Sequence, residues 1–241
     1  MELAREAQVI ITMLPSIAAA KEVVFGQNGV LSVLTQEHVL IEMSTLDLGT
    51  VLALSDAVTS RGASFLDAPV SGTPEIIERR DGEILASGKK ETVDECMEIF
   101  NAFTKKVVYV GKVGNGKAMK LCSNMLIALN KLAVTETVTF ALKLGIEPRV
   151  ITEVIKGSNG NSVVFERYGT AAIAGNEKIS KKHSWQRTDL SLVLETARQK
   201  SIELKLGDLA QKITQDASDQ AEGAEDFECI RQYFRRAMNL E

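Results

Sequence analysis

The chain has 241 residues, of which 45% are hydrophobic and 25% charged, a composition that excludes a disordered protein. Its 28 basic and 32 acidic residues give a net charge of −4, so the charge balance favours neither a nucleic-acid partner nor an anionic membrane. Three widely separated cysteines exclude a disulfide framework, fit no metal-ligand spacing and indicate reduced thiols in the cytoplasm. The longest apolar runs are interrupted by Thr, Lys or Glu, so no membrane span is expected.

Five short runs rich in Val, Ile and Leu predict buried strands in the first half of the chain. They are Gln8–Leu14, His38–Met43, Ala63–Ala68, Glu83–Ser87 and Lys106–Val110. Apolar residues at helical spacing predict helices between them, over Ile17–Phe25, Leu46–Arg61 and Glu91–Phe103. Strands that alternate with helices indicate a mostly parallel sheet covered on both faces.

The second half of the chain has no convincing strand pattern. Lys117–Leu144 is a long run without Gly or Pro that is apolar almost all round, which predicts a buried helix. Gly145 ends that helix and Pro148 opens the next. Further helices are expected over Arg149–Lys156, Val163–Ala174, Ser184–Gln199, Leu206–Gln220 and Asp226–Met238. We therefore expect a partial Rossmann-type α/β domain over residues 1–112 and an all-helical domain over residues 113–241.

The predicted strands end in small and hydroxylated residues. Ligands of open parallel sheets bind beyond the carboxyl ends of the strands. Here those ends lead into Thr12–Ser16, Met43–Thr45 and Asp67–Thr73. Such residues often do no more than form turns, but three strands that end in this way favour a shallow crevice with backbone N–H groups available to an anion.

The stretch Val108–Met125 runs from a strand through a glycine-rich turn into the long helix, whose unpaired first N–H groups favour negative charge. The spacing of Gly111–Lys117 fits the phosphate-binding loop of a nucleotide hydrolase, except that Ala118 replaces the hydroxyl that would bind magnesium. The same turn resembles the start of a dinucleotide fingerprint, but Met119 stands where the third glycine belongs.

A third interpretation places the chemistry on Lys120 and Asn124, which project from the same face of the helix. An amine and an amide on an otherwise apolar helix are costly to bury without a purpose. From these two residues alone, an ion-paired lysine and a backbone-bonded asparagine explain the pattern equally well.

Four separated stretches of the chain resemble the β-hydroxyacid dehydrogenase family. They are ITMLP at 11–15 with the strand end Glu42–Thr45, FLDAPVSG at 65–72, GNGKAMKLCSN at 114–124 and TDLSLVLE at 188–195. The resemblance implies a dinucleotide domain followed by a helical domain. It also implies NAD or NADP as cofactor, a small carboxylate-bearing 3-hydroxy acid or its semialdehyde as substrate, and assembly into homodimers or homotetramers.

The resemblance also implies roles for individual residues. Lys120 matches the family's catalytic lysine, which would act as general acid and base, and Asn124 would hold the substrate or the lysine in line. The remaining matches are Ser71, Gly72 and Thr73 for the substrate carboxylate, and Leu14, Pro15, Thr45, Thr188 and Asp189 for the cofactor. No residue matches a metal ligand.

The chain departs from the family pattern at four places, the mildest of which is Ser123 where an asparagine is common. No Gly-x-Gly-x-x-Gly turn precedes Gln8, so the chain resembles a member without its first quarter, and we expect weak cofactor binding. Thr73-Pro74 replaces a Gly-Gly pair, and Thr188 replaces a lysine. A cofactor-defective family remnant that acts as a binding or scaffolding protein is therefore the alternative to an enzyme, ahead of the nucleotide hydrolase.

Overall fold

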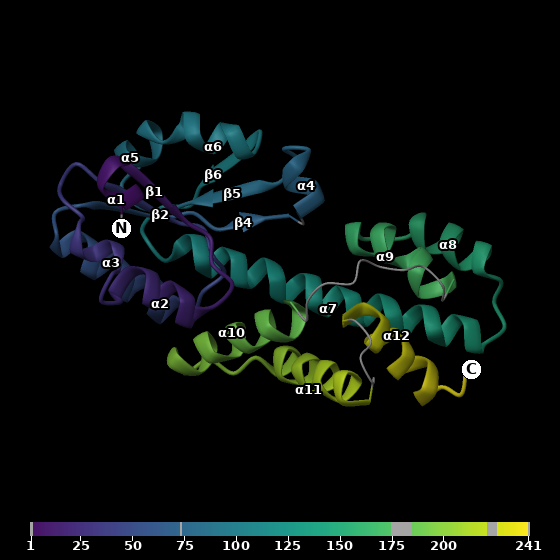
Figure 1. Ribbon diagram of the computed structural model, residues 1–241. Helices are drawn as coiled ribbons and strands as arrows, with labels where there is room; N and C mark the ends of the chain where they lie inside the picture. The colour runs from purple at the N-terminus through teal and green to yellow at the C-terminus, as the bar shows by residue number, and fades with distance from the viewer. Residues whose placement is uncertain (1, 73, 175–184, 221–225, 241) are drawn as a thin grey trace. The chain divides into compact units, whose positions relative to one another are not determined.

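A computed structural model describes residues 2–72, 74–174, 185–220 and 226–240 (Figure 1). The chain forms two compact units, Met1–Cys122 and Ser123–Glu241. The long helix α7 (Asn115–Lys143) begins in the first unit and continues into the second.

The first unit contains two three-stranded sheets. In one, β1 (Val9–Thr12), β2 (Val39–Glu42) and β3 (Ser64–Asp67) run parallel in that order. In the other, β5 (Glu83–Ala86) pairs antiparallel with β4 (Val70–Ser71) and parallel with β6 (Lys106–Tyr109). A bridge between Asp67 and Ser87 joins the ends of β3 and β5. The five predicted strands are confirmed, whereas β4, with two residues, is too short to leave a pattern in the sequence.

Helices cover both faces of the parallel sheet, with α2 (Ile17–Phe25) and α3 (Leu48–Ser60) on one side and α5 (Lys90–Glu95) and α6 (Met97–Phe103) on the other (Figure 1). Neighbouring residues of β2 and β3 point to opposite faces of the sheet. Leu40 and Phe65 pack in the cluster that contains α2 and α3, while Ile41 and Leu66 pack in the cluster that contains α5 and α6. This is why the middle residues of β2 and β3 are apolar on both faces of the sheet.

Three short helices were not expected from the sequence: α1 (Glu2–Glu6), the 3-10 turn η1 (Val30–Ser32) and α4 (Pro74–Glu78). The prediction of one helix over Glu91–Phe103 was wrong, because the chain breaks at Cys96 between α5 and α6. Cys96 is buried in the second cluster, which also contains Val93 of α5 and Phe100 of α6.

The described residues of the second unit form helices joined by turns. The helices after α7 are α8 (Pro148–Lys156), α9 (Val163–Ala174), α10 (Trp185–Gln199), α11 (Lys205–Gln220) and α12 (Asp226–Ala237). One apolar cluster joins Leu132 of α7 to Leu190 of α10 and Ile230 of α12. A second joins Val138 of α7 to Ile151 of α8 and Phe165 of α9. These clusters bury one side of α7.

Burial of α7 is one-sided, whereas its sequence predicts burial all round. Leu126 and Phe140 are 59% and 56% exposed on the side away from the two clusters. By length and composition α7 also qualifies as a membrane span, contrary to our expectation from the interrupted apolar runs. The buried first turn of α7 and its packing against five other helices, α8 to α12, explain the same composition within a globular fold.

Glu228 on α12 gives a stability prediction. Burial raises the pKa of its carboxyl, but hydrogen bonds from Arg231 and Gln232 outweigh burial, so the pKa of Glu228 lies below its usual range. Because the folded-state pKa is depressed, this stabilisation is present at neutral pH and is lost as the pH falls through the folded-state pKa. Glu228→Gln is expected to lower the free energy of unfolding at neutral pH by about 1 kcal/mol or less, given its partial exposure.

The measurement is urea denaturation of wild type and Glu228→Gln between pH 7 and pH 3. The difference between them should shrink toward the acidic end. Glu195→Gln is the matched control, because its partner Arg198 is 69% exposed and such pairs contribute little. An equal difference at every pH would contradict the assignment.

Candidate active site

The first turn of α7 is capped by side chains from two strands. Asp67, at the end of β3, accepts hydrogen bonds through Oδ2 from the backbone N–H groups of Gly114 and Lys117, both at 3.1 Å. Ser87, which follows β5, accepts the N–H of Gly116 through Oγ at 3.2 Å and donates to Asp67 Oδ2 at 3.0 Å. These are the N–H groups that a helix start leaves unpaired, so they are satisfied inside the protein.

Lys117 completes this arrangement with a buried ion pair. Its Nζ lies 2.9 Å from Asp67 Oδ1 and donates a hydrogen bond of 3.0 Å to the backbone oxygen of Glu42. The side chains of Lys117 and Asp67 are both 0% exposed. Buried lysines are rare unless they are paired in this way.

The glycines of the turn allow α7 to pack closely against the strands. A Cβ on Gly116 would lie 2.8 Å from the backbone oxygens of both Asp67 and Leu85, closer than atoms can approach. Gly114 has a φ of +93°, which other residues rarely adopt, and a Cβ there would meet Leu48 at 2.8 Å. The turn therefore lets α7 approach the strands directly.

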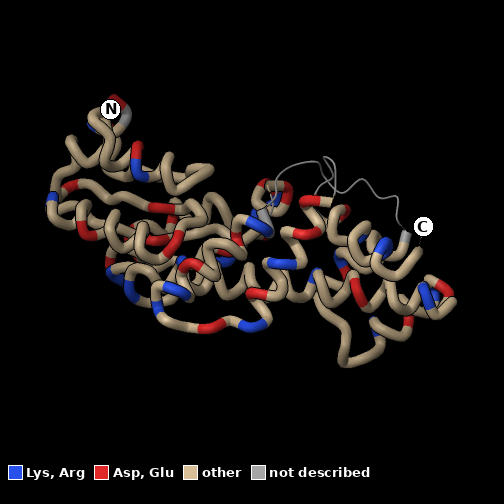
Figure 2. Tube along the Cα trace, turned by 90° about the horizontal axis from the view of Figure 1, so that it is seen from below, with Lys and Arg blue, Asp and Glu red and all other residues tan. Residues whose placement is uncertain are grey.

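These contacts correct the expectation that the helix start offers N–H groups to an anion, because Asp67 and Ser87 already occupy them. They also argue against the phosphate-binding loop, since the ammonium of Lys117 is buried against Asp67 instead of reaching toward a phosphate. Helix α3 likewise begins with a carboxylate, Asp47, which accepts the N–H of Thr50 at 2.9 Å. Figure 2 shows acidic and basic positions interspersed along the described chain.

The loops after β1 and β2 are held together by a buried carboxylate. Glu42, 0% exposed, accepts hydrogen bonds of 2.6 Å from the hydroxyl of Thr12 and from the N–H of Ser44. Ser44 in turn accepts the N–H of Leu14 at 2.8 Å. Leu14 and Thr45, which were predicted to line the cofactor, therefore belong to adjacent loops at the carboxyl edge of the parallel sheet.

This edge offers apolar and small groups beside one another. Met13 is 65% exposed and Pro15 is exposed, while Leu14 and Thr45 are half-buried. A flat ring suits such a surface, whereas a phosphate at the first turn of α3 or α7 would meet Asp47 or Asp67. The described residues thus fit the nicotinamide end of a dinucleotide, and these two helix starts do not fit its pyrophosphate.

The predicted carboxylate-binding residues lie at the end of β4. Ser71 is half-buried in the antiparallel pair with Glu83, and Gly72 follows with a φ of +148°, a conformation open to glycine. Thr73 lies outside the described residues. The Thr73-Pro74 departure therefore falls where α4 begins at Pro74.

Lys120 and Asn124 are one turn apart on α7. Lys120 is only 9% exposed. In the second unit, the Nδ2 of half-buried Asn124 donates a hydrogen bond of 2.9 Å to Oδ2 of Asp189 on α10. The structure thus brings together two predicted residues that are 65 positions apart. Thr188, the departure beside Asp189, has an exposed side chain.

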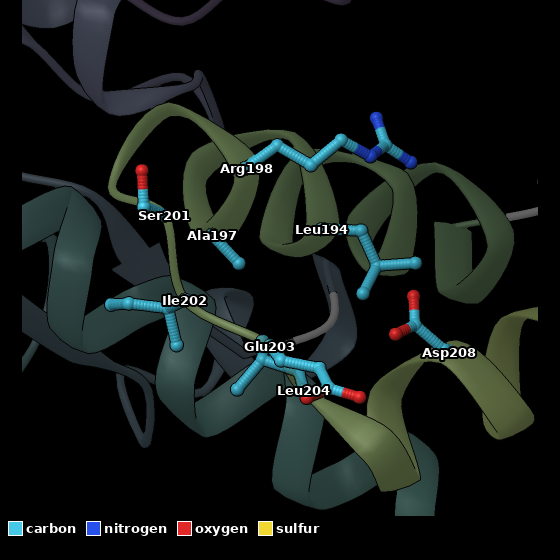
Figure 3. A pocket seen from close by; sticks show the side chains of 8 residues that line it. All are labelled: Leu194, Ala197, Arg198, Ser201, Ile202, Glu203, Leu204 and Asp208. Carbon is cyan, nitrogen blue, oxygen red and sulfur yellow. The ribbon is translucent and has the colours of Figure 1, made fainter.

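A shallow pocket of about 360 Å³ lies elsewhere in the second unit, at the turn between α10 and α11 (Figure 3). It is lined by Leu194, Ala197, Arg198, Ser201, Ile202, Glu203, Leu204 and Asp208, and it contains none of the predicted site residues. Among the described residues, no group of three or more His, Cys, Asp or Glu is arranged to hold a metal ion.

Sequence reasoning assigned no role to Asp67, Ser87 or Glu42. Asp67 stands within the FLDAPVSG stretch, and a carboxylate at the end of an otherwise apolar strand was the available signal. Glu42 gave the same signal at the end of β2. Ser87 gave none, because its partner Gly116 is 29 residues away in the chain.

Comparison with known protein families covers nearly the whole chain. Residues 1–111 match the family described as the NAD binding domain of 6-phosphogluconate dehydrogenase. Residues 114–234 match the family described as NAD-binding of NADP-dependent 3-hydroxyisobutyrate dehydrogenase.

Individual relatives agree with these matches. The mitochondrial 3-hydroxyisobutyrate dehydrogenase of Mus musculus is 29% identical over 97% of this chain and 72% of its own length. The 2-(hydroxymethyl)glutarate dehydrogenase of Eubacterium barkeri is 25% identical over 95% of this chain and 76% of its own length. The solved structure of Mycobacterium tuberculosis 3-hydroxyisobutyrate dehydrogenase with L-serine has the same fold, with a TM-score of 0.88, 24% identity and coverage of 97% of this chain and 81% of that one.

Proposed function

The chain belongs to the β-hydroxyacid dehydrogenase family, a family of NAD(P)-dependent oxidoreductases, and we propose that it interconverts a small 3-hydroxy acid and its semialdehyde. The observation that carries this proposal is the burial of Lys120 one helical turn beyond Lys117, whose ammonium reaches the ends of β2 and β3. Ligands of parallel sheets bind beyond that edge. An amine held there suits proton transfer to a small bound molecule.

Lys120 is the general acid and base of the proposed reaction. In oxidation its neutral amine accepts the proton of the substrate hydroxyl while the C–H bond of the same carbon breaks. In reduction its ammonium donates that proton to the carbonyl oxygen. A nicotinamide, when bound, accepts or supplies the hydride.

Asn124 positions the reacting oxygen. Because the carboxylate of Asp189 can only accept hydrogen bonds, it holds the Nδ2 side of the amide and leaves Oδ1 as the atom that can accept from a hydroxyl or an ammonium. Asp189 thus orients Asn124, and Asn124 orients Lys120 or the substrate hydroxyl.

The cofactor and substrate positions complete the proposal. Leu14, Pro15 and Thr45 would hold the nicotinamide, because the contact between Leu14 and Ser44 fixes both loops at the sheet edge. Ser71 and Gly72, with Thr73, would bind the substrate carboxylate through backbone N–H groups. Exposed Thr188, beside Asp189, would face the cofactor with a hydroxyl where the family has a lysine.

The test is a spectrophotometric assay of NAD and NADP reduction. Its substrates are 3-hydroxyisobutyrate, 2-(hydroxymethyl)glutarate and L-serine, at cofactor concentrations raised until the rate saturates. Reduction with at least one of these 3-hydroxy acids, and none with a 2-hydroxy acid of equal length, is the expected result. Specific cofactor binding without any turnover would favour the remnant that acts as a binding protein.

We also propose that a second copy of the chain covers the exposed side of α7. Leu126, Ala133 and Phe140 are exposed at intervals of seven residues, with Ile127 beside them. Apolar residues at this interval are typical of helices that pair lengthwise, and closed pairs of identical chains are the commonest assembly. Leu126→Glu is expected to convert a dimer or tetramer into a smaller species in light scattering.

Glu136→Gln is the control for the oligomer experiment, because Glu136 is exposed on the same helix and its loss leaves the apolar residues in place. A wild-type chain that is monomeric, or a Leu126→Glu variant of unchanged mass, would contradict the proposed pairing. The cytoplasmic location stays a prediction; the Mus musculus relative is named as mitochondrial.

A further inference from the structure

The turn before α7 is rich in glycine and is held by its own hydrogen bonds, among them one of 2.7 Å from Asn115 Nδ2 to the backbone oxygen of Val110. Gly111 and Gly114 precede the helix with φ values of +95° and +93°, so the backbone there is held by glycines instead of by stiff residues. The helix itself is apolar on most sides, and its exposed Met119 lies within the first turns. Apolar packing alone would therefore leave rotation of the helix about its axis weakly specified.

Polar side chains from outside the turn also hold the start of α7. Two strand ends, Asp67 and Ser87, hold the three N–H groups of Gly114, Gly116 and Lys117. These hydrogen bonds fix the distance between the first turn of α7 and the ends of β3 and β5. The side chain of Lys117, clamped between Asp67 Oδ1 and the Glu42 carbonyl, fixes which side of the helix faces β2 and β3.

We infer that Lys117 is a positioning residue, whose buried ammonium sets the rotation of α7 and thereby the place of Lys120. Three residues along a helix correspond to a net rotation of about 60° and an advance of about 4.5 Å. Lys120 must then lie on the same side as Lys117, one step farther beyond the strand ends, in agreement with its 9% exposure. An apolar side chain would fill the space of Lys117, but it could not be tied to two specific oxygens.

This inference rests on the proposed role of Lys120 and predicts a particular kinetic pattern. A misplaced Lys120 impairs proton transfer without changing the groups that bind substrate or cofactor. Displacements of about 1 Å at a reacting group cost up to about 100-fold in rate. The expected change is thus a lower kcat at unchanged KM for both substrates.

Two variants test the inference. Lys117→Met with Asp67→Asn removes both charges together and leaves an amide oxygen that can still accept the N–H groups of Gly114 and Lys117. Lys117→Gln removes the charge but keeps a donor. Lys112→Met, an exposed lysine of the same turn, is the matched control. Folding is checked by circular dichroism, and hydrogen exchange of the amides of residues 114–118 gives a readout independent of activity.

The expected result is a fall in kcat of about 10- to 100-fold with KM unchanged, together with faster exchange of amides 114–118, in whichever of the two variants folds. A folded variant with kcat within about twofold of wild type and unchanged exchange would overturn the inference, and so would failure of both variants to fold, which would make Lys117 a structural residue only. Lys120→Ala is assayed in parallel. Full activity in that variant would overturn the proposed function instead. The exchange data would still show whether the contacts of Lys117 with Asp67 and Glu42 hold the start of α7.

Discussion

Lys120→Ala is expected to lower kcat by about 10²- to 10⁴-fold, because it removes the group that exchanges a proton with the substrate oxygen. Alanine favours the helix, so the fold should persist. The KM of the cofactor should change little, since its proposed contacts lie on the loops after β1 and β2. The measurement is steady-state kinetics in both reaction directions, with circular dichroism as a check on folding.

The matched control is Lys112→Ala, which removes an exposed lysine from the turn just before α7. Its kcat should equal that of wild type. Equal losses in the two variants would point to a general effect of charge, and full activity in Lys120→Ala would remove Lys120 from the mechanism.

Gly116→Ala is expected to lower the free energy of unfolding by about 3 kcal/mol, near the upper end for overpacking. The added Cβ would lie 2.8 Å from two backbone oxygens, those of Asp67 and Leu85, which belong to strands and cannot rotate away. The helix preference of alanine, about 1 kcal/mol, offsets only part of this cost. Urea denaturation gives the free energies.

Gly157→Ala is the control for this substitution. Gly157 also lies at a helix end, but it has a φ of −84° and its added Cβ would make only an ordinary contact of 3.5 Å with Glu153. Its stability should stay within about 0.5 kcal/mol of wild type. A Gly116→Ala variant that is as stable as wild type but no longer binds nucleotide would contradict this account, because it would show that the turn binds phosphate.

The fold could be predicted because its signals are local. Buried parallel strands give continuous apolar runs, and the ends of α7 and α8 are marked by Gly145 and Pro148. The break at Cys96 could not be predicted, since nothing in the run Glu91–Phe103 forbids one continuous helix. It arises from packing in the core.

The site was predictable only in part. Helical spacing places Lys120 and Asn124 on one face, but it cannot show that Lys117, three residues before Lys120, is held in a buried ion pair. That ion pair depends on Asp67, which is 50 residues away in the chain. The side chains that cap α7, Asp67 and Ser87, are also far from it in the chain and could not be predicted. The sequence therefore suggested that the first N–H groups of α7 are free to bind an anion, whereas these two side chains already accept their hydrogen bonds.

Transfer of deuterium tests the proposed chemistry most directly. The substrate is a 3-hydroxy acid that carries deuterium on the carbon bearing the hydroxyl, and the reduced cofactor is analysed by mass spectrometry. We expect one deuterium in the cofactor for each semialdehyde formed, and almost none with Lys120→Ala over the same time. Semialdehyde without label in the cofactor, or equal label transfer by Lys120→Ala, would contradict hydride transfer assisted by this lysine.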